Sequence, residues 1–355
     1  MRRSVAFCFR SAGRFCCGML AASSLLVSSP VMATEAGWRP YVVPGSASNP
    51  ESIQVALFYP TQAPAREIAM GPFTLRVAIK APPEARFKGL IVLSHGTGGS
   101  ELGHSSLAEA LARDGYLVAA LRHPGDNWED RSIWDKAPDA FFTERPRQAS
   151  RVIDALLSDT DWKDRIAADA KGPRIGVLGH SAGGFTAIAL AGGQSDLSRI
   201  GAHCEKERAD DPLFCSMGRT GQPSQGQPSQ GLPTLTSTTD KRVRAVVAMA
   251  PMGVVFTASS LAGIDIPVSV YAAQNDRWLV PRFHAEWIAK NVPRAEFHTV
   301  ANAWHFAFMD RPSVPTPTLD GDAAADPLGF DRTAFLAQLR SEILVFFDNA
   351  FAAGQ

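Results

Sequence analysis

Short apolar runs alternate with helix-like segments over most of the chain. The runs are typical of buried strands and cover 90–94, 116–121, 174–178, 243–249, 266–273 and 295–300. The segments with helical periodicity cover 105–114, 146–157, 185–191, 282–291 and, as an amphipathic closing helix, 335–351. This alternation predicts an α/β fold in which a mostly parallel, doubly wound sheet carries helices on both faces.

Two regions depart from this alternation. Residues 41–80 alternate apolar with polar residues, which predicts antiparallel edge strands. Residues 193–241 interrupt the strands and helices with two cysteines, a charged stretch and a tandem Gly-Gln-Pro-Ser-Gln at 221–230. We expect one domain over 34–355, with 193–241 as a lid-like insertion. Its cysteine-bearing half is expected at the pocket rim, while the polar repeat is equally compatible with a solvated loop without a role.

The insertion follows a glycine-rich turn between the strand 174–178 and the helix 185–191. The turn has the sequence Gly179-His180-Ser181-Ala182-Gly183-Gly184. Glycines two residues to either side let the chain turn too tightly for larger neighbours, so that the serine hydroxyl stands clear at the top of the sheet. The pattern predicts a nucleophile elbow with Ser181 as nucleophile.

Further candidates follow other strands in a defined order. Asp276 follows the strand 266–273, and His305 follows the strand 295–300. Serine, acid, histidine is the chain order of α/β-hydrolases and differs from the orders of the two main serine protease folds. The loop after the strand 90–94 is rich in glycine, so the backbone N–H of Thr97, together with that of Ala182, is expected to bind an oxyanion.

The remaining histidines and acids fit these roles less well. His95 and His180 flank the glycines of the two key loops and are expected to pack there, while His284 lies in a predicted helix and His298 in a predicted strand. Two other acids, Asp240 and Asp265, immediately precede strands and therefore fall at the wrong edge of the sheet.

Composition and the N-terminus place the chain among exported globular proteins. Apolar residues make up 45% of it and charged residues 20%, an ordinary globular balance. Four arginines precede an apolar run at 19–27 and the small-residue site Val31-Met32-Ala33. This predicts a cleaved signal peptide over 1–33 and a periplasmic or secreted protein. The alternative, a membrane anchor, needs a longer apolar run, so we expect no stable membrane insertion.

Charge and cysteines narrow the partners. The first 33 residues hold four arginines and no acid, so the rest has a net charge of about −4 and no basic stripe. Nucleic acid is therefore not expected as a partner. Cys204 and Cys215 remain, with only His203 nearby, which favours a disulfide over a metal site in an exported chain. The proposed chemistry requires no metal or organic cofactor.

Four segments, 94–99, 119–127, 176–184 and 243–251, resemble an α/β-hydrolase group labelled predicted dienelactone hydrolases. That group is similar to plasma-type platelet-activating-factor acetylhydrolases, and the resemblance covers roughly residues 50–310. It implies the α/β-hydrolase fold. Dienelactone hydrolases proper use a cysteine nucleophile, whereas this elbow holds Ser181, which favours ordinary ester chemistry.

These observations predict a serine hydrolase that cleaves small-molecule carboxylic esters of short to medium acyl chain through Ser181, His305 and Asp276. The same residues permit a peptidase or a lactone or phospholipid acyl hydrolase. A hydrolase-fold protein that binds a ligand without turning it over is the alternative from a different class.

Overall fold

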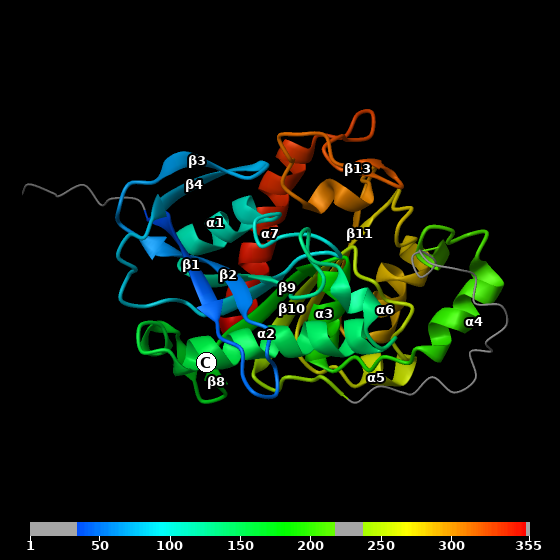
Figure 1. Cartoon of the computed structure of the whole chain (residues 1–355), viewed down its shortest axis with the longest axis horizontal. Coiled ribbons are helices and arrows are strands. Elements are labelled where there is room, and N and C mark those ends of the chain that lie inside the picture. The colour runs from blue at the N-terminus through cyan, green and yellow to red at the C-terminus, as the bar shows by residue number, and fades with distance from the viewer. Residues whose placement is uncertain (1–33, 217–236, 353–355) are drawn as a thin grey trace, which may run out of the picture. The chain divides into compact units, whose positions relative to one another are not determined.

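A ten-stranded sheet forms the centre of the computed structural model, which describes residues 34–216 and 237–352 (Figure 1). The strands lie in the order β12-β11-β10-β9-β5-β6-β2-β1-β4-β3, and the first six of these run parallel. The parallel strands are β5 (Leu90–Ser94), β6 (Leu117–Arg122), β9 (Ile175–His180), β10 (Val243–Met249), β11 (Val268–Ala273) and β12 (Glu296–Val300). The predicted mostly parallel sheet is confirmed.

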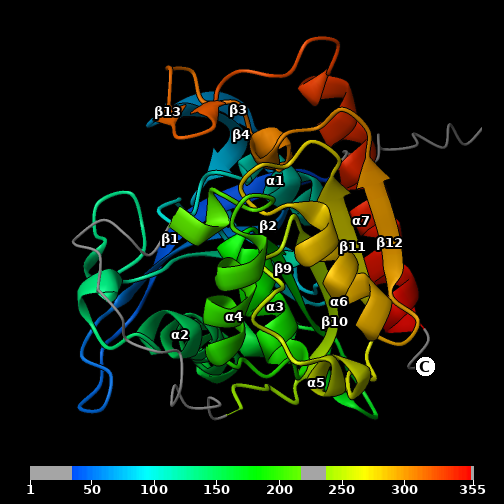
Figure 2. The ribbon, with the colours of Figure 1, turned by 90° about the vertical axis from the view of Figure 1, so that its right-hand side faces the viewer.

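Successive side chains of the parallel strands enter two separate cores. In β5, Leu90 and Val92 belong to one core, and Ile91 and Leu93 belong to the other. Because both faces are buried, such strands are continuous apolar runs in the sequence. One face is covered by α2 (Ala140–Ser158), α3 (Ala182–Ala191) and α6 (Ala285–Asn291), the other by α1 (Ser105–Arg113) and α7 (Arg332–Ala352) (Figure 2). The doubly wound arrangement is therefore confirmed.

Four strands before β5 extend the sheet at one side. They are β1 (Glu35–Val43), β2 (Ile53–Thr61), β3 (Arg66–Met70) and β4 (Phe73–Ile79). As predicted, β2 is antiparallel to β1 and β6, and β3 is antiparallel to β4. The short pairing between β1 and β4 is parallel, which the alternating pattern did not predict.

Helix α2 begins earlier than its sequence pattern indicates. The expected start at Pro146 is wrong, since the helix begins at Ala140 and holds Pro146 inside it. Phe141 and Phe142 lie in the added turns and pack on Phe185 of α3, with ring centroids 6.1 and 5.4 Å apart. Burial of these two rings offsets the cost of an interior proline.

The remaining elements are short. They are α4 (Ser198–Glu207), α5 (Ala258–Ala262), the two-residue strands β7 (Ala168–Asp169), β8 (Gly172–Pro173), β13 (Pro317–Thr318) and β14 (Gly321–Asp322), and the 3₁₀ turns η1 (Ser132–Asp135), η2 (Lys163–Arg165), η3 (Phe214–Ser216), η4 (Pro281–Phe283) and η5 (His305–Phe308). Within 34–216 and 237–352, no helix combines the length and apolar character needed to cross a membrane. The expected signal peptide at 1–33 and the repeat at 221–230 lie outside the described residues.

Candidate active site

Ser181 lies on a strained turn between β9 and α3. Its backbone has φ 58° and ψ −117°, a conformation that costs free energy in a residue with a Cβ. The flanking glycines leave no room for side chains: a Cβ on Gly179 would lie 2.0 Å from the Gly183 carbonyl oxygen. A Cβ on Gly183 would lie 1.8 Å from the Ser94 carbonyl oxygen in β5. Ser181 is half-buried between two buried neighbours, so its side chain is open to a ligand.

Asp276 and His305 meet at the same edge of the sheet. Asp276 follows β11, His305 begins η5 beyond β12, and His305 Nδ1 lies 2.7 Å from Asp276 Oδ2. The other carboxylate oxygen of Asp276 accepts the backbone N–H groups of Trp278 and Leu279, both at 2.9 Å. The carboxylate is thus fixed from both sides, and both residues of the pair are nearly fully buried.

His180 brings the elbow against His305. Its Nε2 donates to the His305 carbonyl oxygen at 2.9 Å, and the two ring centroids lie 4.9 Å apart. Burial holds the pKa of His180 well below its usual value, so this ring stays uncharged beside His305. In the described structure no hydrogen bond joins the Ser181 hydroxyl to His305. Hydrogen bonds of this kind are often long before substrate binds.

The two expected oxyanion donors lie on adjoining loops. A Cβ on Gly96 would lie 3.2 Å from Ser181 Cβ, which places the loop after β5 directly against the elbow. Thr97 is exposed at the tip of that loop, and Ala182 is the first residue of α3. Within 34–216 and 237–352, neither backbone N–H donates to a protein acceptor. Both are therefore available to a ligand.

A buried polar network lies beneath this loop, and no signal in the sequence pointed to it. Arg145 of α2 and Asp126, both fully buried, form an ion pair at 2.5 Å. Nearby, His123 Nε2 lies 2.8 Å from Ser94 Oγ. Burial, with a further contribution from the Arg145 charge, holds the pKa of His123 well below its usual value. Asp126 lies in one of the segments that resemble the hydrolase group, whereas Arg145 lies in none of them.

The described part of the insertion joins the loop that follows β10. The predicted disulfide between Cys204 and Cys215 is confirmed. Asp211, which lies between them, accepts hydrogen bonds at 2.9 Å from His203 Nε2 and His284 Nε2.

Phe214 is buried in the same part of the insertion. It packs edge-on to His284, with ring centroids 4.7 Å apart. His284 Nδ1 accepts the Gly253 N–H at 3.1 Å, and the neighbouring Met252 N–H donates to the Ser181 carbonyl. The insertion is therefore linked to the elbow through two residues of one loop.

His95, His284 and His298 also occupy structural positions. His95 Nδ1 donates to the Gly96 carbonyl oxygen at 2.7 Å. His284 caps the start of α6 rather than lying within it, and His298 in β12 stacks on Tyr271 with centroids 4.5 Å apart.

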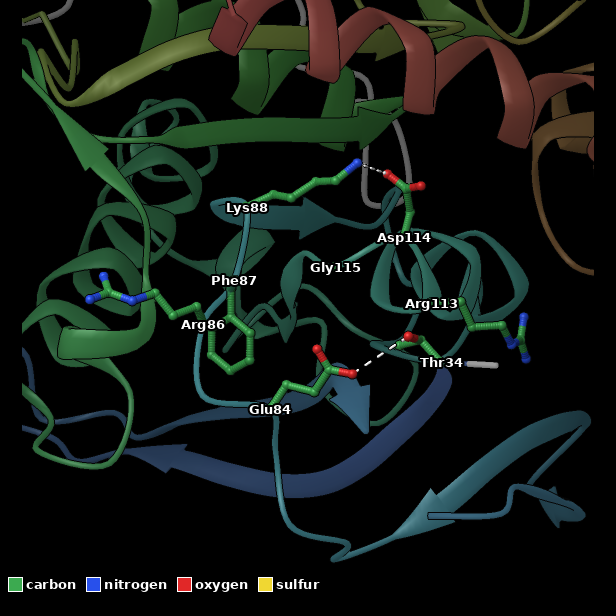
Figure 3. Close-up of a pocket in the computed structure, with 8 residues that line it drawn as sticks. All are labelled: Thr34, Glu84, Arg86, Phe87, Lys88, Arg113, Asp114 and Gly115. Atoms are coloured by element: carbon green, nitrogen blue, oxygen red, sulfur yellow. Dashed lines mark hydrogen bonds and ion pairs between the residues drawn. The ribbon is translucent and has the colours of Figure 1, made fainter. Parts of the chain in front are cut away.

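A shallow depression of about 420 Å³ lies away from this edge, at the opposite ends of β5 and β6 (Figure 3). Within it Lys88 pairs with Asp114 at 2.6 Å, and the Thr34 hydroxyl donates to Glu84. It contains no candidate nucleophile. In the described ranges, no three His, Cys, Asp or Glu side chains gather in a way that could hold a metal ion.

The sheet, the elbow and the loops at its carboxyl edge together define an α/β-hydrolase fold. A model described as the alpha/beta hydrolase family matches residues 91–315, more than half of the chain. The protein therefore belongs to the alpha/beta hydrolase family.

Some known proteins are similar to part of this sequence, and others are similar to its fold. Cutinase est1 and cutinase est2 of Thermobifida alba are each 31% identical to it over 116 residues, which is 33% of this chain and 34% of each relative. The chain thus matches about a third of the length of these relatives. A ferulic acid esterase structure from Streptomyces cinnamoneus superposes with a TM-score of 0.57 at 21% identity, covering 91% of this chain and 92% of that one. At that identity the likeness shows the fold alone.

Proposed function

We propose that this protein is a serine esterase that hydrolyses small carboxylic esters through Ser181, His305 and Asp276. The observation that carries the proposal is the 2.7 Å contact between His305 Nδ1 and Asp276 Oδ2, buried at the sheet edge where the strained elbow presents Ser181. A histidine oriented by a buried carboxylate next to a serine on such a turn is the arrangement that activates a hydroxyl nucleophile.

The reaction proceeds in two halves. His305 Nε2 takes the Ser181 proton as Oγ bonds to the ester carbonyl carbon, and Asp276 stabilises the resulting imidazolium. The Thr97 and Ala182 N–H groups bind the negative oxygen of the tetrahedral intermediate. The intermediate then expels the alcohol, which takes the proton from His305. Water, deprotonated by His305, attacks the acyl-serine, and the carboxylic acid leaves as Ser181 regains its proton.

The names of the relatives favour an ester over an amide as the substrate. The curated proteins that match a third of the chain are named cutinases. Within the family, we propose that the chain is close to the group labelled predicted dienelactone hydrolases, with serine where dienelactone hydrolases proper use cysteine. We propose a short to medium acyl group, because the disulfide-closed half of the insertion can supply apolar cover, whereas the repeat at 221–230 is too polar to seal a long chain.

Hydrolysis of p-nitrophenyl esters from acetyl to palmitoyl tests the proposal, with the corresponding p-nitroanilides as amide controls. We expect turnover to be highest between acetyl and roughly hexanoyl, because methylenes beyond the end of the pocket contribute little of their ~0.8 kcal/mol transfer energy. Faster cleavage of the anilides would identify a peptidase. A preference for palmitoyl with activation at a lipid interface would identify a lipase and contradict the proposed preference for short to medium acyl groups.

A further inference from the structure

The fully buried ion pair between Arg145 and Asp126 has no evident role in stability. An ion pair taken out of water gains little, because desolvation of the two charges offsets their attraction, and apolar residues of similar volume are often as good. Arg145 comes from the middle of α2, and Asp126 comes from the loop after β6. The two residues meet under the loop that follows β5, and each of them also binds the backbone of that loop.

Both members of the pair reach the loop, one on each side of Thr97. Arg145 Nη2 donates to the His95 carbonyl oxygen, and Asp126 Oδ1 accepts the Gly98 N–H at 3.0 Å. The His95 carbonyl belongs to the peptide before the Gly96–Thr97 peptide, and the Gly98 N–H belongs to the peptide after it. The ion pair therefore fixes the two peptides that flank the one carrying the Thr97 N–H.

The Gly96–Thr97 peptide itself is fixed through its oxygen. His95 Nε2 accepts the His123 N–H at 3.2 Å, so its Nδ1 carries the proton and donates to the Gly96 carbonyl oxygen. The same oxygen accepts the Gly99 N–H at 3.0 Å. In a trans peptide the N–H points opposite to the carbonyl, so fixing the Gly96 carbonyl also fixes the direction of the Thr97 N–H, away from His95.

The loop needs this restraint because of its sequence. Glycines at 96, 98 and 99 can adopt conformations closed to other residues, and Gly98 does so with φ +64°. Without these hydrogen bonds the Gly96–Thr97 peptide can rotate, which would turn the Thr97 N–H away from the oxyanion. An oxyanion donor contributes most when it is already in place before charge develops.

We propose that Arg145 and Asp126 are positioning residues that hold the Thr97 N–H in its oxyanion-binding orientation; this inference rests on the proposed esterase function. Neither side chain touches the substrate. The ion pair acts through the backbone, so its loss weakens binding of the transition state and leaves binding of the ground-state ester nearly intact.

The informative variant replaces the whole pair, Asp126→Leu with Arg145→Met, because removing one partner leaves a buried charge alone and endangers folding. We expect kcat to fall on the order of 10²-fold while KM stays within a few-fold. Affinity for a trifluoromethyl ketone, which forms an oxyanion when Ser181 adds to it, should fall by a similar factor. Arg145→Lys keeps the charge but bridges two acceptors less well than arginine does. Its kcat and its ketone affinity should therefore lie between those of the double variant and those of the wild type.

Arg244→Met is the matched control. Arg244 pairs with Asp169 at 2.7 Å near the start of β10, at the opposite edge of the sheet. Its loss should lower the unfolding temperature and leave kcat and ketone affinity unchanged. If the double variant keeps wild-type kcat and ketone affinity, or if it changes KM alone, the positioning role is wrong.

Hydrogen exchange over residues 95–99 separates this inference from the proposed function. Faster exchange is expected in the double variant than in wild type and in Arg244→Met, whether or not the protein turns over an ester. Unchanged exchange would show that the ion pair does not hold this loop in place. If the wild-type loop is protected from exchange but the protein shows no Ser181-dependent hydrolysis, the proposed esterase function is wrong. The ion pair would then hold the loop without a catalytic role.

Discussion

Asp276 divides its two carboxylate oxygens between the backbone and His305. Oδ1 is held by the Trp278 and Leu279 N–H groups, which leaves Oδ2 to accept from His305 Nδ1. The proton on Nδ1 in turn leaves Nε2 with the free lone pair that a general base needs. The orientation of the Asp276 side chain thus determines which nitrogen of His305 carries the proton.

Asp276→Asn should reverse that tautomer without disturbing the fold. The asparagine oxygen can still accept from Trp278 and Leu279, so its NH₂ group points at His305 and forces the proton onto Nε2. We expect kcat to fall by about 10³- to 10⁴-fold, with an unchanged circular dichroism spectrum and unfolding temperature. A variant with a kcat within ten-fold of wild type would show that Asp276 is not the acid of this site.

His104 gives a second prediction at this scale, on stability. It is 2% exposed, and neither ring nitrogen has a partner in the described structure, so burial lowers its pKa to about 4. The unfolded chain takes up a proton near pH 6.5, but the folded chain does not until about pH 4. The free energy of unfolding therefore decreases as the pH falls through this window.

His104→Phe removes that contribution. Between pH 6.5 and 4.5 its free energy of unfolding in urea should decrease less steeply than that of wild type, by about one proton or ~1.4 kcal/mol per pH unit. In both proteins the free energy of unfolding still depends on pH, because four other buried histidines also have lowered pKa values: His95, His123, His180 and His284. Equal slopes would mean that His104 is protonated in the folded state.

At the scale of elements, the insertion is attached by polar contacts around one carboxylate. Asp211 joins His203 of α4 to His284 before α6, and Phe214 fills the space beside both rings. The disulfide closes the segment that contains Asp211. We therefore expect this half of the insertion to influence the substrate pocket through its packing on the loop at 252–253.

Phe214→Ala should alter the acyl-chain preference, whereas deletion of 221–230 should leave it nearly unchanged. Loss of the buried ring costs about 3–5 kcal/mol of packing and leaves His284 free to shift, together with Gly253 beside the elbow. The measurement is the ratio of kcat/KM for p-nitrophenyl acetate, hexanoate and decanoate in the two variants. If the deletion changes the acyl-chain preference and Phe214→Ala does not, the repeat rather than Phe214 influences the pocket rim.

For the whole molecule, the sequence predicted the parallel sheet because both faces of its strands are buried, which leaves continuous apolar runs at regular spacing. It also indicated that Asp276 and His305 would meet, since the carboxyl ends of parallel strands share one edge. It could not predict the pairing of Arg145 with Asp126. Their contact joins a helix to a loop, and a single buried ion pair leaves no periodic signal.

The early start of α2 escaped prediction for a related reason. Pro146 marks a helix end by local preference, and only the tertiary contact of Phe141 and Phe142 with Phe185 extends the helix past it. The sequence shows that Phe214 is apolar, but not that it packs against His284. In both cases the deciding contact is with a residue distant in the chain.

We also propose that the molecule is exported after cleavage at Ala33. Protein recovered from its own compartment should then begin at residue 34, with Cys204 and Cys215 oxidised to each other, because thiols at disulfide distance are oxidised outside the cytosol. Intact-mass analysis with and without alkylation measures both. An uncut N-terminus together with two alkylated cysteines would count against export.

The kinetics of Ser181→Ala, His305→Ala and the double variant on p-nitrophenyl acetate test the central claim most directly. The two side chains act as one unit, so each single change should remove nearly all turnover and the double change should lose little more. Substantial hydrolysis by Ser181→Ala, or losses that multiply in the double variant, would contradict the account of Ser181 as a nucleophile activated by His305.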